Sequence, residues 1–269
     1  MYIRKTWRAG RTVEVKKTQS FRYGKSTSRG GNLKQTGDAQ AAVNRRNAVA
    51  ELRRLLNANF QPGDHHAIFT YPQKAPPTKE QARLDLDRFL RRLRRVYRDR
   101  ETELKYVAVT EYRHSRIHHH VVLPNLPGGM KPVKALWKRL LAETYYTPEE
   151  RKRGEPLHLR FPWSELDDSG QYGALAEYLI KETDDTRRKP DGRIGRRYRA
   201  SRNLEHPKPV VVEVSAKEWR EEPPPRKGYY IDKNGSWSGV SEENGILIQE
   251  TIYVSLSQTR KRKGVKQNE

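Results

Sequence analysis

Three consecutive histidines, His118, His119 and His120, lead directly into the apolar run Val-Val-Leu at 121–123. In a β-strand, alternate side chains project from opposite faces, so His118 and His120 share one face and His119 lies on the other. Two imidazoles about 7 Å apart on one strand face could hold one metal ion. The apolar run favours a strand over a loop. A histidine-rich strand end without a metal fits the tripeptide equally well.

The residues upstream predict a third ligand for this site. Residues 106–112 favour β-structure, and residues 113–116 form a short polar break before the histidines. We therefore predict an antiparallel hairpin. A symmetric turn places Glu111 directly opposite His118, and opposed side chains lie about 4.5–5.5 Å apart at Cβ. An odd-length turn would shift the register by one residue and point Glu111 to the wrong face.

A tyrosine and a lysine three residues apart, Tyr178 and Lys181, lie in a segment that we predict to be helical. A phenol is a weak nucleophile because its pKa is near 10, but a nearby ammonium group and a metal-polarised phosphate would make its attack practicable. Taken alone, the pair is more typical of a half-buried tyrosine beside an exposed lysine. Tyr172 does not share the helix face of Tyr178, and we interpret it as a packing or DNA-contact residue whose catalytic role stays open.

The net charge of the chain points to a polyanionic partner. There are 55 Lys and Arg against 33 Asp and Glu, giving +22 and a pI near 10.2, which favours nucleic acid as the partner. Two histidines and a carboxylate also describe non-haem iron oxygenases, but those enzymes need no such charge. Residues 1–35 hold ten Lys or Arg and one Glu, and residues 257–269 hold five and one. We predict basic terminal arms, the first flexible and facing DNA, with an edge strand at 11–16 as the alternative.

Hydrophobic periodicity predicts an α+β fold: an antiparallel or mixed sheet with helices packed on it, in the order β-α-β-β-α-β-α, related to ferredoxin-like and RNA-recognition folds. Apolar residues that share the metal-binding face indicate that the last helix covers part of it. The predicted elements after an N-terminal helix from Asp38 to about Ala58 are a strand at 66–71, a helix at 78–98 capped by Thr78, the hairpin, a helix at 133–144, a strand at 157–163 and a helix at 171–181.

These elements predict a division of the chain into a basic flexible arm (1–37), an N-terminal helix (38–63), a central domain (64–205), a small C-terminal extension with short strands (206–256) and a basic tail (257–269). The absence of cysteine excludes disulfides and thiolate metal sites. No apolar run reaches membrane-spanning length and no signal-peptide core is present, so we expect a cytoplasmic protein. His65, His66 and His158 are interpreted as surface or core histidines.

The motifs together resemble the HUH endonuclease superfamily, and within it the single-tyrosine rolling-circle replication initiators of plasmids and filamentous phages. The resemblance covers roughly residues 64–205. It departs from the family at His119, where an apolar residue is usual. The matching segments are Phe69-Thr70-Tyr71-Pro72 for the first motif, Glu111, His118 and His120 for the metal motif, Tyr178 with Lys181 for the nucleophile motif, and Arg199-Ala-Ser-Arg202-Asn-Leu204 for a segment typical of phage-type members.

The resemblance implies a reaction and its partners. Mg²⁺ or Mn²⁺, held by Glu111, His118 and His120, would polarise a scissile phosphate of single-stranded DNA at a replication origin. Attack by Tyr178 would give a 5′-phosphotyrosine and a free 3′-OH, which a bacterial host's DNA polymerase extends with a helicase, and the same bond would permit rejoining. Lys181 would orient the ion or neutralise phosphate charge. The residues that we expect to contact DNA are Thr70, Tyr71, Arg113, Arg116, Arg199 and Arg202.

Other interpretations remain open at this point. Relaxases and transposases of the superfamily share the chemistry, although relaxases often place the tyrosine before the histidines. A DNA-binding regulator without catalytic activity would also explain the charge. No glycine-rich Walker loop is present, so we expect no nucleotide cofactor and no fused ATPase or helicase.

Overall fold

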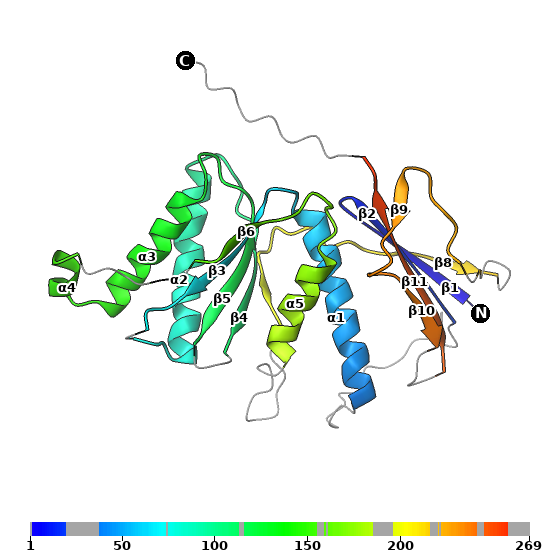
Figure 1. The fold of residues 1–269 in the computed structure, drawn as a ribbon, viewed down its shortest axis with the longest axis horizontal. Helices are drawn as coiled ribbons and strands as arrows, with labels where there is room; N and C mark the ends of the chain where they lie inside the picture. The colour runs from blue at the N-terminus through cyan, green and yellow to red at the C-terminus, as the bar shows by residue number, and fades with distance from the viewer. Residues whose placement is uncertain are drawn as a thin grey trace, which may run out of the picture. The chain divides into compact units, whose positions relative to one another are not determined.

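The described chain forms two compact units, and each takes segments that are distant in sequence (Figure 1). The first unit draws on Met1–Asn59, Ser169–Glu177 and Glu205–Lys263, and the second on Phe60–Asp168 and Tyr178–Leu204. The computed structural model describes residues 2–19, 38–73, 75–112, 116–154, 159, 161–184, 196–215, 220, 222–240 and 245–257.

A five-stranded sheet forms the centre of the second unit. Its strands follow the order β6-β3-β5-β4-β7, and every neighbouring pair is antiparallel. The predicted α+β class with an antiparallel sheet is therefore confirmed. The strands are β3 (His65–Thr70), β4 (Val107–Glu111), β5 (His118–Leu123), β6 (Trp163–Glu165) and β7 (Arg199–Ala200).

Two helices pack on one face of this sheet, α2 (Lys79–Arg98) and α3 (Lys131–Tyr145). The predicted cap of α2 is confirmed, since Thr78 accepts a hydrogen bond from the Gln81 amide. In the core, the ring centroid of Phe69 lies 4.8 Å from Phe89 and 5.4 Å from Trp137. Burial of aromatic rings at such distances supplies much of the stabilisation of a core of this size.

Two short elements complete the second unit. The helix α4 (Pro148–Lys152) begins with a capping box between Thr147 and Glu150, in which each side chain accepts a hydrogen bond from the other residue's amide. The helix α5 (Gly173–Asp184) contributes its residues from Tyr178 onward to this unit and the preceding ones to the first. Neither α4 nor the edge strand β7 was predicted, because both are too short to show a hydrophobic period.

The strand predicted at 157–163 is wrong in position. The segment that pairs with β3 is Trp163–Glu165, and of the predicted range only Trp163 lies in a described strand. Pro162 has no amide hydrogen to give to a β-ladder. Its carbonyl instead accepts a hydrogen bond from Ile68 at 3.0 Å, just before the regular pairing begins. The other predicted helices and the hairpin are confirmed to within three residues at each end.

The first unit is a six-stranded antiparallel sheet with one helix, α1 (Asp38–Asn59), as predicted from Asp38 to about Ala58. The sheet runs β10-β11-β2-β1-β8, and β9 pairs with the end of β11. It joins distant parts of the sequence, because the N-terminal hairpin is flanked by strands from beyond residue 209. Its strands are β1 (Tyr2–Ala9), β2 (Thr12–Gln19), β8 (Val210–Val214), β9 (Tyr229–Ile231), β10 (Trp237–Val240) and β11 (Leu247–Ser255).

The prediction of a flexible basic arm at the N-terminus is wrong for residues 2–19, which form two central strands. One face of this hairpin is buried, with Trp7 under the Arg54 guanidinium at 3.9 Å. Glu14 forms ion pairs with Arg53, at 2.6 Å, and with Arg54. Burial alone would raise the pKa of Glu14, but the two guanidinium groups hold it below its usual value. The predicted arm residues 20–37 and tail residues 258–269 lie outside the described part of the chain.

The turn between β1 and β2 explains how this hairpin packs so closely on α1. Gly10 has a φ of +54°, and a Cβ there would lie 2.0 Å from the carbonyl oxygen of Asn57. Only glycine fits this approach. The same Asn57 accepts a hydrogen bond from the Tyr172 amide at 2.9 Å, and Tyr172 is only 2% exposed. Tyr172 is thus a packing residue, one of the two roles expected for it.

No helix in the described part of the chain is long and apolar enough to cross a membrane.

Candidate active site

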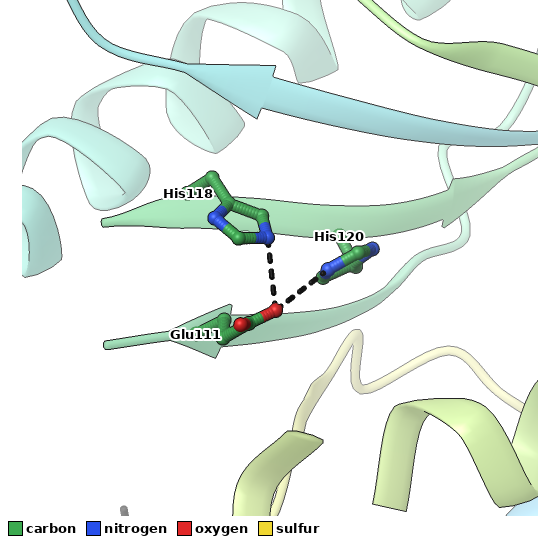
Figure 2. Close-up of side chains that lie close together, drawn as sticks. All are labelled: Glu111, His118 and His120. Carbon is green, nitrogen blue, oxygen red and sulfur yellow. Dashed lines mark ion pairs between the residues drawn. The ribbon is translucent and has the colours of Figure 1, made fainter. Parts of the chain in front are cut away.

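The predicted register of the β4–β5 hairpin is confirmed by its pairing. Glu111 lies opposite His118, and Val109 lies opposite His120. Because the side-chain period of a strand is two residues, Glu111, His118 and His120 project from the same face of the sheet. Figure 2 shows the three side chains converging from the two neighbouring strands.

The three side chains bring their ligand atoms to one point. The Oε2 atom of Glu111 lies 2.9 Å from Nε2 of His118 and 3.5 Å from Nε2 of His120 (Figure 2). One ligand atom from each residue lies within 4.8 Å of the others. Two imidazole nitrogens and a carboxylate oxygen suit a divalent cation, so this group could bind a metal ion. It is the one such group found in the described residues.

His120 is the most buried of the three and carries the clearest sign of a ligating role. Its side chain is flanked by Ile68 on β3 and Val109 on β4, and only 1% of it is exposed. Burial lowers the pKa of His120 to about 3, so the imidazole is neutral at neutral pH, as a metal ligand must be. Its Nε2 atom is buried and has no hydrogen-bond partner among the described residues. A bound cation would satisfy this atom.

Sequence analysis missed one residue of the site, His66. Its Nε2 atom lies 3.1 Å from Nδ1 of His120, and the two rings stack with their centroids 5.3 Å apart. Burial lowers the pKa of His66 to about 4, so this ring is also neutral. A hydrogen bond to the second nitrogen of a ligating histidine fixes its orientation. The alternation of β3 could have suggested this face for His66, but its pairing with β5 was not predicted.

We expect that His66→Phe lowers the affinity for Mn²⁺ by about 10- to 100-fold, the usual cost of removing the hydrogen-bond partner of a ligating histidine. Phenylalanine keeps the stacking on His120 but removes the hydrogen bond to Nδ1. Isothermal titration calorimetry with Mn²⁺ on the full chain measures the effect. His66→Gln, which can still reach a hydrogen-bond partner, should restore part of the affinity. Equal Mn²⁺ affinity in His66→Phe and the unchanged protein would rule out an orienting role.

His119 lies on the opposite face of the sheet, as predicted from strand alternation. Its Nε2 atom is 2.8 Å from the Tyr71 hydroxyl, and its Nδ1 atom is 2.9 Å from Oγ1 of Thr110. The side chain is fully buried, and burial lowers the pKa of His119 to about 3. A neutral imidazole with both nitrogens hydrogen-bonded fixes β5 against β4 and against the residue that follows β3. His119 therefore does not compete for a metal on the other face.

Tyr178 lies directly against the candidate metal centre. Its ring centroid is 5.3 Å from that of His120 and 6.4 Å from that of His66, both in edge-on arrangements. Its side chain is 41% exposed, so the phenol is reachable from solvent. This contact agrees with the prediction that the last helix covers part of the metal-binding face. Lys181 follows one helical turn later and is exposed.

Two of the expected DNA contacts lie near the site's strands, and two do not. Thr70 is paired with His118 at the end of β3, and Arg116 is exposed just before β5. Tyr71 is buried in the core, where its hydroxyl meets His119, so it supports the sheet rather than offering a surface. Arg199 is paired with Ala108 on the face covered by α2.

The remaining basic candidates differ in their surroundings. Arg199 forms an ion pair with Asp87 of α2, which holds its guanidinium on the helix-covered side of the sheet. Arg202 is exposed after β7. Arg113 lies outside the described residues.

One comparison with known proteins gives a match. Residues 67–183 match the model of a family of replication-associated proteins, the ORF2 family. The matched segment is less than half of the 269 residues, and it contains Glu111, both facing histidines, Tyr178 and Lys181. No curated protein and no solved structure matches the chain. The match supports a role as a replication initiator.

Proposed function

We propose that this protein is an HUH-type initiator of rolling-circle replication that cuts single-stranded DNA at a replication origin and rejoins it. Tyr178 is the nucleophile, and Glu111, His118 and His120 hold Mg²⁺ or Mn²⁺. The observation that carries the proposal is the contact of Tyr178 with His120, the most buried of the three candidate ligands. A tyrosine beside a candidate metal centre has no evident part in oxygenase chemistry but is what phosphoryl transfer to a phenol requires.

The reaction exchanges one phosphodiester for another. The phenolic oxygen of Tyr178 forms a bond to the scissile phosphorus and loses its proton, while the bond from phosphorus to the 3′-oxygen breaks. The released 3′-oxygen takes up a proton, and the 5′-phosphate remains on Tyr178. Because one phosphate ester replaces another, a 3′-OH can attack the phosphotyrosine in reverse, which rejoins strands. A cation held by the three ligands supplies positive charge at the phosphate.

The neighbouring residues have supporting parts in this proposal. Lys181 lies one turn from Tyr178 and neutralises phosphate charge with its ammonium group. Thr70, at the end of β3 opposite His118, and Arg116, just before β5, contact the bound strand. The free 3′-OH would be extended by a host DNA polymerase, with a host helicase separating the strands, in the cytoplasm of a bacterial cell.

The test is incubation of the full chain with labelled single-stranded DNA from the origin of its own replicon, in Mn²⁺ and in Mn²⁺ with excess chelator. We expect a cleaved strand with a free 3′-OH and a protein–DNA adduct that survives denaturation, both lost with the chelator. DNA binding without cleavage or adduct would instead support a regulator. Turnover that needs iron and oxygen would support the oxygenase.

A further inference from the structure

The six-stranded sheet of the first unit has one face covered by α1 and one that carries a row of basic side chains. Trp7 and Glu14 project toward α1, where Arg54 meets both. Because side chains alternate along a strand, Arg4, Thr6 and Arg8 of β1 project from the opposite face. Lys17 of β2 lies directly opposite Arg4 on that same face.

Two hollows open on this face and share its central residues. The larger, of about 580 Å³, includes Arg4, Thr6 and Lys17 together with Arg220 and Arg226. The smaller, of about 510 Å³, also includes Arg4 and Thr6, and extends past Arg8 to Lys208 and the exposed strand β8. Since the two hollows meet at Arg4 and Thr6, they form one continuous surface over β8, β1, β2 and β11, which we call the open face.

One wall of the open face is fixed by hydrogen bonds. Gln249 of β11 donates to the Arg220 carbonyl at 2.9 Å, and the Tyr253 hydroxyl donates to the Pro224 carbonyl at 2.9 Å. Beside them, the Arg226 guanidinium lies 4.9 Å from the ring centroid of Tyr229. The backbone that carries Arg220 and Arg226 is therefore held against the edge of the sheet, so these cations are presented by a built surface.

The charge of the open face is strongly one-sided. Its larger hollow is lined by four basic residues and no acidic one among the described residues. The smaller one adds Arg8, Lys208 and His206, against a single acidic residue, Glu205. Arg4 and Arg8 are four residues apart, about 13 Å along an extended strand. Such a spread of cations suits an extended polyanion better than a small anion.

We propose that the open face binds the phosphate backbone of duplex DNA, at a surface separate from the candidate active site. Single-strand binding usually relies on exposed aromatic rings on which bases stack. The one aromatic residue lining the larger hollow is Tyr253, which is 5% exposed and has its hydroxyl bound to Pro224. The basic and small polar residues match phosphate contacts, which are independent of sequence and depend strongly on salt. This inference does not depend on strand cleavage.

The test uses the full chain with Arg4, Arg8 and Arg220 all replaced by Gln. Binding to a fluorescent duplex of arbitrary sequence is measured by anisotropy over a series of salt concentrations. Each lost phosphate contact lowers the slope of log K against log salt by about 0.9. We therefore expect the slope to fall by roughly 2 to 3, and the affinity at about 0.1 M salt to fall by at least about tenfold.

Matched variants separate the open face from net charge. Replacing Arg91, Arg94 and Arg98 on the exposed face of α2 by Gln removes the same charge and should leave the slope nearly unchanged. Replacing Arg4, Arg8 and Arg220 by Lys should retain binding, and thermal unfolding checks that each variant is folded. Equal losses in the two Gln triples would overturn the proposal, as would a loss confined to single-stranded DNA. Adduct formation on a short single strand should persist in the open-face variant, whatever happens to duplex binding.

Discussion

Tyr178→Phe is expected to abolish the covalent protein–DNA adduct while leaving the affinity for single-stranded origin DNA within about twofold. The substitution removes only the phenolic oxygen, the atom that would form the bond to phosphorus. The ring that contacts His120 and His66 is kept, so the packing around the candidate metal centre should not change. Denaturing gel electrophoresis of the adduct measures the first effect, and anisotropy with the same oligonucleotide measures the second.

Two further tyrosines serve as matched controls for this substitution. Tyr172→Phe removes the hydroxyl of a buried tyrosine in the segment just before α5, and Tyr230→Phe removes one that is exposed. Both variants should form the adduct at the rate of the unchanged protein. If Tyr178→Phe still forms the adduct and Tyr172→Phe does not, the nucleophile has been assigned to the wrong residue. Adduct formation in all three variants would exclude a tyrosine at these positions.

The candidate metal centre could be predicted from sequence because its geometry is local. Glu111 and His118 are separated by a short turn, so a hairpin and the two-residue period of a strand determine which side chains face each other. The structure confirms that register. The contact with His66 could not be predicted in the same way, because it depends on β3 lying beside β5, which are more than forty residues apart in sequence. A long-range pairing leaves no trace in either strand alone.

The N-terminal hairpin shows a different limit. Its high content of Lys and Arg suggested an arm, since a charged segment with few apolar residues rarely buries enough surface to fold alone. This segment folds because its apolar residues, such as Ile3 and Trp7, alternate onto one face and are covered by α1. Its neighbours in the sheet, β8 and β11, come from beyond residue 209. The basic residues are then presented in register on the open face rather than scattered along an arm.

These two arrangements give the protein different relations to DNA. The candidate active site combines buried, neutral histidines with one buried carboxylate, a set suited to a cation. The open face consists of cations spaced along extended strands, a set suited to phosphates. If both proposals hold, the open face would hold a duplex flank while Tyr178 acts on a single strand. Raising the salt concentration should then weaken duplex binding far more than it weakens the metal site.

Glu111→Gln is expected to lower the affinity for Mn²⁺ by at least about 100-fold, since loss of a direct ligand should exceed the cost of losing an outer one. The amide has the shape of the carboxylate but lacks its charge, so the packing of the hairpin should be kept. Adduct formation should fall below detection at Mn²⁺ concentrations that saturate the unchanged protein. Glu103→Gln, which neutralises an exposed carboxylate in the same unit, should leave both quantities unchanged.

Thermal unfolding gives a readout of this site that does not depend on cleavage. A cation that binds only the folded state stabilises it by about 2.7 kcal/mol at roughly 100 times its Kd. We therefore expect Mn²⁺ to raise the Tm of the unchanged protein and of Glu103→Gln, and to leave the Tm of Glu111→Gln nearly constant. Without metal, Glu111→Gln should be at least as stable as the unchanged protein, because the buried carboxylate beside two histidines loses a charge that nothing else in the site requires. An equal rise in Tm with Mn²⁺ for all three proteins would show that the cation binds elsewhere, and the assignment of Glu111 as a ligand would fail.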